Sequence, residues 1–399
     1  MDEFKLNFYD TKTAFADKSN EELQKKFWLF KLLNSPLITN LGTRLTEYAF
    51  GLKLPIKSLV KETVFRQFCG GETIEECETT IQKLGRSQIG TILDYSIEGK
   101  ASEAVFESTK NEIYRTVTRA KEELYIPFAV FKITGVARFE ILEKICASKE
   151  LLKGEAAEWE RAKARIYEIC RHAYTLEQSI FIDAEESWIQ EAIDNLVTDL
   201  MREFNGEKPI IFNTVQLYRH DRLEYLKAAH SKAKSEGYIL AVKLVRGAYM
   251  EKERARAEEM NYPSPIHADK KAVDQDFNSA IEYCLENIAG IAFVAGTHNE
   301  ESVQKLAQLM EQKNIPHNHP HIYFSQLYGM GDNLSYVLAD NNFNVSKYVP
   351  YGPVKDTVPY LIRRAKENTS VTGQMSRELD LLSKELERRR RENRTSTKI

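Results

Sequence analysis

The stretch YILAVKLVRGAY, residues 238–249, is a short apolar run with a charged end, and a charged helical segment follows it. Apolar and β-branched residues in a run of this length predict a strand that is buried on both faces. The same unit of a short apolar run and a longer amphipathic segment recurs along the chain. The other runs are IGTILDYS (89–96), IPFAVFKITGV (126–136), SIFIDAEES (179–187), PIIFNTVQLY (209–218), GIAFVAGTHN (290–299), HIYFSQLYGM (321–330) and VSKYVPYG (345–352).

The alternation of strand and helix predicts a fold of the α/β class. Segments such as ESWIQEAIDNLVTDLMREF and EESVQKLAQLMEQKN carry helical periodicity and separate the apolar runs. Repeated strand and helix units imply a parallel sheet, and eight of them match a closed (βα)8 barrel of the TIM type. A doubly wound open sheet is the alternative.

The chain divides into three predicted parts. Residues 1–88 are expected to form an N-terminal helical segment, since SNEELQKKFWLF has a capping residue, helix formers and apolar periodicity. Residues 89–375 are expected to form the barrel, with additional helices in its longer connections. Residues 376–399 are expected to form a charged C-terminal helix and tail. Its basic run, residues 388–391, is explained by helix-dipole and solubility effects, with a peripheral membrane or partner contact as the alternative.

Composition indicates a soluble enzyme. The 399 residues are 42% hydrophobic and 29% charged, and the formal net charge of -3 gives no general attraction to nucleic acid. The five cysteines stand singly, which favours a reducing compartment. The acidic start MDEFKLNFYD has no leader pattern, and no apolar run reaches the length of a membrane span. We therefore expect a cytoplasmic protein whose contact with a membrane, if it has one, is peripheral.

Polar residues gather where the predicted strands end. The catalytic residues of a (βα)8 barrel lie at the carboxyl ends of its strands, so these positions predict a site. They are Asp94, Lys132, Asp183 with Glu185 and Glu186, Gln216, Lys243, Arg246, Thr297, His298, Asn299, Gln326 and Tyr348. Any one of them could instead cap a helix or lie in a solvated loop.

The end of the run 238–249 suits a large anionic cofactor with a planar ring. Lys243 and Arg246 supply positive charge, Gly247 and Ala248 allow a ligand to approach the backbone, and Tyr249 can close over it. A strand followed by the charged start of a helix is the plain structural interpretation.

A helix near the end of the chain carries two adjacent arginines. In YGPVKDTVPYLIRRAKENTS, residues 351–370, we expect the helix to begin near Val358, with Pro359 in its first turn. One face then holds Tyr360, Arg363, Arg364 and Glu367, so the glutamate can brace the arginines. Two guanidinium groups beside an aromatic wall could hold a small carboxylate. A solvated helix face is the alternative.

Other chemistries find little support in the sequence. His317, His319 and His321 alternate, but two prolines interrupt them and they precede a strand, so we predict no metal site. The chain contains no nucleophile elbow, phosphate-binding loop or dinucleotide fingerprint.

The motifs DAEES, KLVRGAY, GTHNE, KYVPYGP and YLIRRAKEN together resemble proline dehydrogenase, the flavoenzyme family that starts proline catabolism. The resemblance runs in order from roughly Asp94 to Asn368 and is closest to the stand-alone type. It implies a (βα)8 barrel that holds FAD and oxidises L-proline to Δ1-pyrroline-5-carboxylate by hydride transfer to the flavin N5. A quinone-type acceptor derived from a membrane would take the electrons.

The resemblance also implies roles for individual residues. Arg363 and Arg364 would bind the proline carboxylate, Lys132 would add positive charge, and Asp183 and Glu367 would orient this basic cluster. The amine proton would pass to solvent or to Asp183. The substrate ring would lie against Leu327, Tyr348 and Tyr360. The cofactor would contact Gln216, Lys243, Arg246, Gly247, Ala248, Tyr249, Thr297, His298, Asn299 and Gln326.

Departures from the family pattern keep alternatives open. Many bacterial members have arginine and lysine where this chain has Lys243 and Arg246, and glutamine at the position of Ser325, one place before Gln326. Relatives that oxidise hydroxyproline lack a tyrosine at the position of Tyr348, so this tyrosine favours proline over hydroxyproline. Outside the family, the alternatives are a Schiff-base lyase that uses Lys132 or Lys243 and a non-catalytic scaffold.

Overall fold

The computed structural model describes residues 4–34, 57–95, 102–370 and 374–396. Within these ranges, the side chains of residues 59, 363–370, 374–375 and 394–396 are outside the description.

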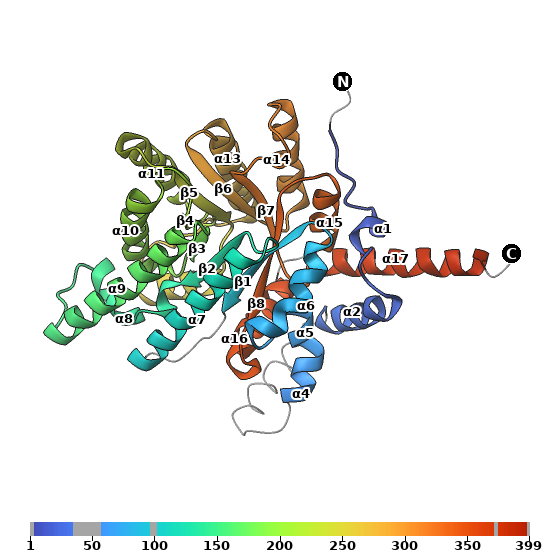
Figure 1. The fold of residues 1–399 in the computed structure, drawn as a ribbon, viewed down its shortest axis with the longest axis horizontal. Coiled ribbons are helices and arrows are strands. Elements are labelled where there is room, and N and C mark those ends of the chain that lie inside the picture. Colours follow the sequence, from blue (N-terminus) through green and yellow to red (C-terminus); the bar gives the residue numbers. More distant parts are fainter. Residues whose placement is uncertain (1–3, 35–56, 96–101, 371–373, 397–399) are drawn as a thin grey trace.

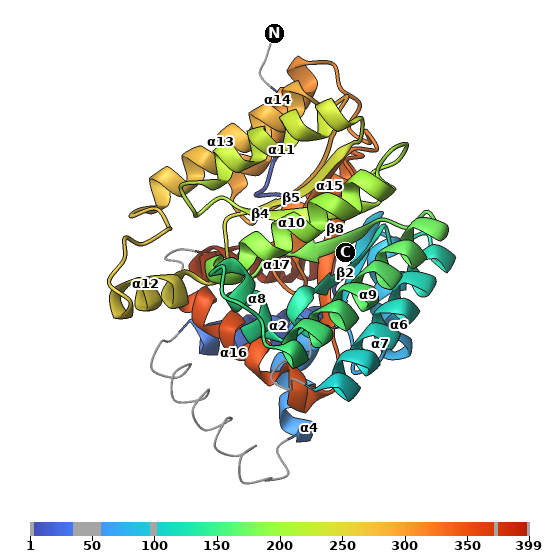
Figure 2. The ribbon, with the colours of Figure 1, turned by 90° about the vertical axis from the view of Figure 1, so that its left-hand side faces the viewer.

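Eight parallel strands form a closed barrel in chain order, β1 to β8 (Figures 1 and 2). Each strand pairs in parallel with its neighbours, and β8 closes the barrel on β1. The (βα)8 prediction is confirmed, and the open-sheet alternative is wrong. The strands are β1 Ile89–Tyr95, β2 Phe128–Lys132, β3 Ile180–Asp183, β4 Ile211–Gln216, β5 Leu240–Val245, β6 Ile291–Gly296, β7 Ile322–Leu327 and β8 Val345–Tyr351.

Helices surround the barrel and connect successive strands (Figure 2). Their apolar faces form one continuous core with the outward faces of the strands. They are α7 Glu103–Glu122, α8 Phe139–Cys146, α9 Lys153–Thr175, α10 Ser187–Phe204, α11 Arg222–Glu236, α12 Met250–Glu259, α13 Lys270–Glu286, α14 Glu300–Gln312, α15 Asp332–Asp340 and α16 Val354–Ser370, with a 3-10 turn at Ile133–Gly135.

The residues that precede the barrel are helical in the parts that the structure describes. They form α1 Thr11–Ala14, α2 Asn20–Leu33, α4 Lys57–Val60, a π-helical turn Lys61–Phe65, α5 Arg66–Phe68 and α6 Ile74–Gly85. Helix α6 packs on the outside of β1, and the segment before it pairs with the end of β8 through Gly70 and Gly71. Helix α16 packs against the π-helical turn, α2, α4 and α17 (Gln374–Ser396).

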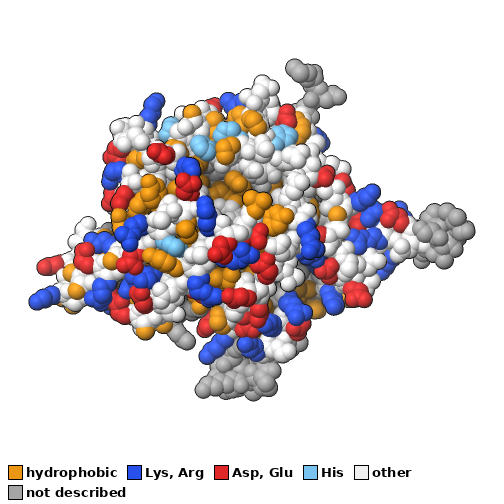
Figure 3. Space-filling model, in the orientation of Figure 1, with side chains coloured by type: hydrophobic (Ala, Val, Ile, Leu, Met, Phe, Trp, Pro, Cys, Tyr) orange, Lys and Arg blue, Asp and Glu red, His pale blue; other side chains and the backbone are white. Residues whose placement is uncertain are grey.

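The two terminal helical regions lie side by side. Helices α2 and α17 contact each other, and the end of α17 projects from the body of the molecule (Figure 1). A second apolar cluster joins them to α16 and to residues 65–69. Basic and acidic side chains intermingle on the face seen in Figure 3, in agreement with the nearly balanced net charge.

Apolar side chains fill the interior of the barrel. The aromatic ring of Phe181 stacks on Phe128 at 4.4 Å between centroids and meets the edge of Phe212 at 5.3 Å. Small and branched side chains of the other strands complete this layer. Successive inward positions on a strand are two residues apart, so the next inward residues toward the carboxyl ends form a second layer.

Candidate active site

The second interior layer is polar. Asp183 follows Phe181 by two residues on β3, and Lys243 follows the interior Ala241 on β5. Lys132, at the end of β2, lies opposite Asp183 in the strand register. Strand β8 places Tyr348 beside Leu327 of β7. The barrel thus brings Lys132, Asp183, Lys243, Leu327 and Tyr348 to one end, as the sequence predicted for its polar strand ends.

Asp183 is the hub of this layer. One of its carboxylate oxygens accepts a hydrogen bond from the Lys243 ammonium, and the other accepts one from the Tyr348 hydroxyl at 2.7 Å. The Lys243 nitrogen also lies 5.1 Å from the centre of the Phe181 ring and 5.0 Å from that of Tyr348. Burial, together with the negative charge of Asp183, raises the pKa of Tyr348 well above its usual value. Tyr348 is therefore a neutral donor that is fixed in place.

Gln216 connects this layer to the neighbouring loops. Its amide nitrogen donates to the carbonyl of Glu185 at 2.7 Å, and its amide oxygen accepts from the backbone N–H of Ala248 at 3.3 Å. The side chain is buried. It therefore fixes the turn after β5 relative to the loop after β3 that begins at Asp183.

Arg246 lies outside the interior, on the rim between α13 and α14. Its guanidinium donates to Asp274 at 2.7 Å, to Thr297 at 2.5 Å and to Ser302 at 2.9 Å. Its charged group also lies over the ring of Phe277. Burial lowers the pKa of Arg246 from its usual value, although Asp274 opposes this effect. The cation is held by side chains from three elements, which fixes its position.

The turn after β5 requires a glycine. Gly247 has φ +137°, and a Cβ atom there would come within 2.5 Å of the Tyr218 ring. Ala248 is exposed and Tyr249 is half-buried. The backbone of this turn therefore packs directly against the Tyr218 ring, and Ala248 is exposed.

The loop after β6 is fixed by hydrogen bonds. Asn299 caps α14 by accepting from the Ser302 N–H at 2.9 Å, and Thr297 accepts from the Asn299 N–H at 3.0 Å. His298 Nε2 accepts from the Leu327 N–H at 3.0 Å and so joins this loop to β7.

Gln326 does not lie with the residues that face the interior of the barrel. It is buried on the outward face of β7, where it donates to the Thr297 carbonyl at 3.1 Å and accepts from Ser335 at 2.8 Å. Because neighbouring residues of a strand face opposite sides, Ser325 and Leu327 take the inward positions.

Helix α16 begins four residues before the predicted start. The N–H groups of Asp356 and Thr357 donate to the Pro353 carbonyl, so Pro353 occupies the helix start and Pro359 lies inside the helix. Tyr360 is buried against the terminal helices, close enough to Tyr348 to affect its pKa. Arg363, Arg364 and Glu367 belong to α16, but their side chains lie outside the described residues.

Glu185 is a polar residue of this region to which the sequence assigned no role. It is buried, and its carboxylate accepts from the N–H of Thr134 at 3.0 Å and from the hydroxyl of the same residue. Burial raises the pKa of Glu185 to about 7, with Thr134 and Lys132 opposing the shift. Glu186, the next residue of the motif DAEES, is also buried, but it accepts from Lys252 at 2.8 Å, whereas Glu185 accepts from Thr134.

The described residues contain no group of three or more histidine, cysteine or acidic side chains arranged to hold a metal ion. His317 stacks on Phe343 with ring centroids 3.8 Å apart and bonds to Glu311. In the same described ranges, no helix is long and apolar enough to cross a membrane.

Comparisons with known proteins identify the family. The sequence profile of proline dehydrogenase matches residues 77–377. The carbapenem antibiotics biosynthesis protein CarD of Pectobacterium carotovorum subsp. carotovorum is 34% identical over 83% of this chain and 85% of its own length. The mitochondrial proline dehydrogenase 1 of Dictyostelium discoideum is 32% identical over 95% of this chain and 74% of its own length.

A solved structure shows the same fold. It is proline utilization A (PutA) from Bdellovibrio bacteriovorus inactivated by N-propargylglycine, which superposes with a TM-score of 0.73 at 22% identity. The match covers 93% of this chain and 40% of the PutA chain, so this chain spans about two fifths of that protein's length. With its eight-stranded barrel and its family match over residues 77–377, the chain belongs to the proline dehydrogenase family and is an oxidoreductase that acts on proline.

Proposed function

We propose that this enzyme binds FAD, oxidises L-proline to Δ1-pyrroline-5-carboxylate and passes the electrons to a quinone-type acceptor. The observation that carries the proposal is the hydrogen-bonded group of Asp183, Lys243 and Tyr348 at the carboxyl end of the barrel, next to the helix that carries Arg363 and Arg364. The family match supports oxidation of proline in general.

The substrate has a carboxylate and a small apolar ring, and the site offers a partner for each. We assign the carboxylate to Arg363 and Arg364, with Lys132 as a further cation, because guanidinium groups pair with carboxylates through two parallel hydrogen bonds. Leu327, Tyr348 and Tyr360 would enclose the ring, with Glu367 bracing the arginines. An apolar wall around the ring and charges at one end fix the orientation of the substrate.

The residues at the rim fit a dinucleotide. Arg246 is a fixed cation at the end of β5, and the turn at Gly247 and Ala248 leaves room for a ligand above the backbone. We assign Lys243, Gln216, Tyr249 and the loop of Thr297, His298 and Asn299 to the same cofactor. When bound there, FAD would supply the two-electron chemistry by accepting a hydride.

Oxidation removes a hydride from a ring carbon and a proton from the secondary amine, and a C=N bond remains. Both oxygens of Asp183 accept hydrogen bonds from protein donors. We therefore assign Asp183 to the orientation of Lys243 and Tyr348, and we assign the amine proton to solvent. The side chains of the site position the reacting C–H bond and keep its surroundings dry.

The lyase alternative is weaker for Lys243 than for Lys132. A Schiff base requires an uncharged amine, whereas the Lys243 nitrogen lies in a buried ion pair with Asp183. Reduction with borohydride in the presence of the product would support the lyase alternative only if it labelled Lys132 in preference to the exposed lysines.

The test is a comparison of Arg364→Met with Arg391→Met in proline oxidation with a soluble quinone as acceptor. Arg391 lies on α17, with a side chain that is 82% exposed. We expect Arg364→Met to raise the KM for proline on the order of 100-fold, because it removes a charge-assisted contact to a desolvated carboxylate. Arg391→Met should leave KM unchanged.

An unchanged KM in a folded Arg364→Met protein would contradict the assignment of the carboxylate site. Turnover of trans-4-hydroxy-L-proline at a higher kcat/KM than that of L-proline would contradict the assignment of the substrate.

A further inference from the structure

The loop that follows β7, residues 328–332, adjoins the proposed site. It begins directly after Leu327, and its backbone turns through Gly329 with φ +82° and Gly331 with φ +61°. The N–H of Tyr328 donates to the carbonyl of Tyr348 at 2.9 Å. The loop is therefore joined to two residues that we assign to the substrate wall.

Three side chains from different elements hold consecutive residues of this loop. Gln67 donates to the Gly329 carbonyl at 2.7 Å, and Lys347 donates to the Met330 carbonyl. The N–H of Gly331 donates to Glu378 at 2.5 Å. These side chains come from α5, β8 and α17, so no neighbouring element fixes the loop by itself.

A buried group of charges anchors the end of the loop. Asp332 accepts from Lys26 at 2.7 Å and lies 3.0 Å from the Lys347 nitrogen. Lys26 also lies 3.9 Å from Glu378. None of these four residues is more than 5% exposed. The positive charges of Lys26 and Lys347 balance the negative charges of Asp332 and Glu378. Buried charges are tolerated when they are paired in this way.

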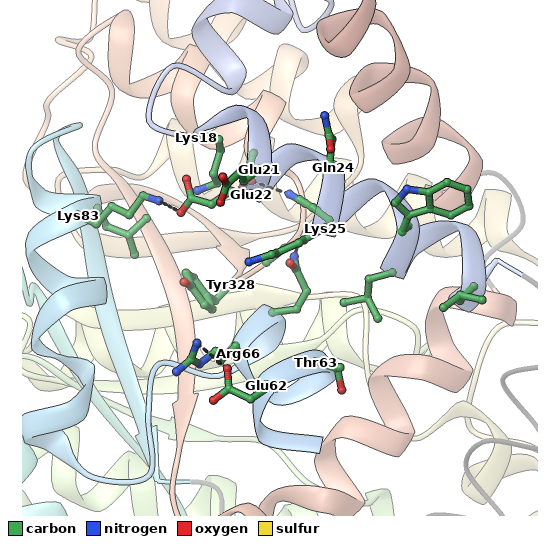
Figure 4. Close-up of a pocket in the computed structure, with 18 residues that line it drawn as sticks. Lys18, Glu21, Glu22, Gln24, Lys25, Glu62, Thr63, Arg66, Lys83 and Tyr328 are labelled. Carbon is green, nitrogen blue, oxygen red and sulfur yellow. Dashed lines mark hydrogen bonds and ion pairs between the residues drawn. The ribbon is translucent and has the colours of Figure 1, made fainter. Parts of the chain in front are cut away.

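The same loop also borders an open space on the side of α2. A cavity of about 930 Å³ lies between α2 and residues 62–67, and Lys26, Tyr328, Gly329 and Asp332 contribute to its wall. Figure 4 shows Tyr328 facing this cavity, below the side chains of α2. On this side the loop packs closely on the backbone of Gln67 at Gly329, and the buried charges hold its end at Asp332.

The loop contacts a residue that we assign to the cofactor. A Cβ atom on Gly331 would lie 2.7 Å from His298 Nδ1, so the backbone of the loop rests against the imidazole ring. His298 in turn accepts from the Leu327 N–H. A shift at Gly331 would therefore move His298 and Leu327 together. Lys347 precedes Tyr348 on β8 and points to the opposite face, so its bonds also fix the strand that carries Tyr348.

Lys26 and Glu378 both lie outside residues 77–377, the part of the chain that the family profile matches. We infer that α2 and α17 are positioning elements of the active site, and that Lys26 and Glu378 act by holding the loop after β7 against His298. The inference rests on the proposed function for the roles of His298, Leu327 and Tyr348.

Variants of Glu378 test this inference. Glu378→Met removes the acceptor of the Gly331 N–H at similar volume, whereas Glu378→Gln keeps an acceptor without the charge. Glu387→Met is the matched control, because Glu387 lies on the same helix with a side chain that is 62% exposed. Lys26→Met and the exposed neighbour Lys25→Met form a second pair on α2.

Two readouts separate the inference from the proposed function. Amide hydrogen exchange of peptides that contain residues 328–334 reports on the loop without cofactor or substrate. We expect Glu378→Met to speed exchange there by about tenfold or more, Glu378→Gln to restore most of the protection, and Glu387→Met to change nothing. In the flavin-loaded enzyme, the KM for proline should rise by about tenfold in Glu378→Met, with a smaller effect on kcat.

Unchanged exchange in the loop of Glu378→Met, or an equal change in Glu387→Met, would overturn the inference. Faster exchange in the loop with an unchanged KM and kcat would overturn it too, because the loop would then move without consequence for the site. If Glu378→Met does not fold, Lys26→Met against Lys25→Met decides by the same criteria. A parent protein that oxidises no proline would refute the proposed function, whereas the exchange experiment would still test whether the helices hold the loop.

Discussion

Replacement of Lys243 by methionine is the perturbation that tests the interior of the site most sharply. Lys243 and Asp183 are 6% and 9% exposed, and their ion pair lies above the Phe181 ring. Removal of one partner from a buried pair leaves a buried charge without compensation, which costs about 3–5 kcal/mol. Asp183 keeps the hydrogen bond from Tyr348, so we expect the lower end of this range, about 3 kcal/mol.

The control is the same substitution at an exposed ion pair. Lys227 pairs with Glu224 at 2.9 Å, and the two side chains are 43% and 78% exposed. Pairs of this kind contribute about 0–1 kcal/mol, so Lys227→Met should barely change the free energy of unfolding. The assay is denaturant unfolding, followed by tryptophan fluorescence, for the two variants and the parent under identical conditions.

A double variant separates the loss of the pair from the loss of the lysine itself. Asp183→Asn removes the uncompensated charge, so the variant with both substitutions should be more stable than Lys243→Met alone. If Lys243→Met and Lys227→Met lose the same small stability, or if Asp183→Asn deepens the loss, the buried ion pair does not have the role assigned to it.

Three further predictions concern single groups. Burial raises the pKa of Glu185 to about 7 from 4.5, so the folded state holds a proton that the unfolded chain releases. The stability from this proton is complete below pH 4.5 and is lost as the pH rises to about 7, and Glu185→Gln should flatten this fall in unfolding measurements across the range. Tyr348→Phe removes one of the two donors to the buried Asp183, so it should raise the KM for proline by about tenfold and lower the free energy of unfolding by about 1 kcal/mol; an unchanged KM would speak against this contact. Gly247→Ala should lower the free energy of unfolding by about 3 kcal/mol and weaken the binding of added FAD, because φ is +137° and the new Cβ atom would clash with the Tyr218 ring. Gly206 has open space around it, so Gly206→Ala should change neither quantity.

The barrel could be predicted from the sequence because its signal is local and repeated. Each strand is a short apolar run, and each run lies between segments of helical periodicity, so the unit is visible without knowledge of distant contacts. The position of polar residues at the strand ends then follows from the fold class. Lys132, Asp183 and Tyr348 are examples.

The start of α16 and the face of Gln326 were harder to predict. Pro359 is compatible with the first turn of a helix, but Pro353 is equally compatible, and α16 begins directly after Pro353 instead. At β7 the resemblance implied a cofactor contact for Gln326, whereas the alternation of the strand turns this side chain to the outward face.

The charges of the terminal helices could not be predicted. Lys26 and Glu378 lie in segments that read as solvated, and Lys347 is a single lysine within an apolar strand. Lys26 pairs with Asp332, which is 306 positions away in the chain, and lies 3.9 Å from Glu378 of the other terminal helix. No periodicity encodes such a contact, because it depends on how α2 and α17 pack against the completed barrel.

The visible absorption spectrum of the purified protein before and after anaerobic addition of L-proline tests the central proposal most directly. We predict the band of an oxidised flavin, as purified or after FAD is supplied, and its bleaching when L-proline is added. A flavin band that L-proline leaves unchanged would contradict the proposed substrate, and a protein that binds no FAD would contradict the proposed function as a whole.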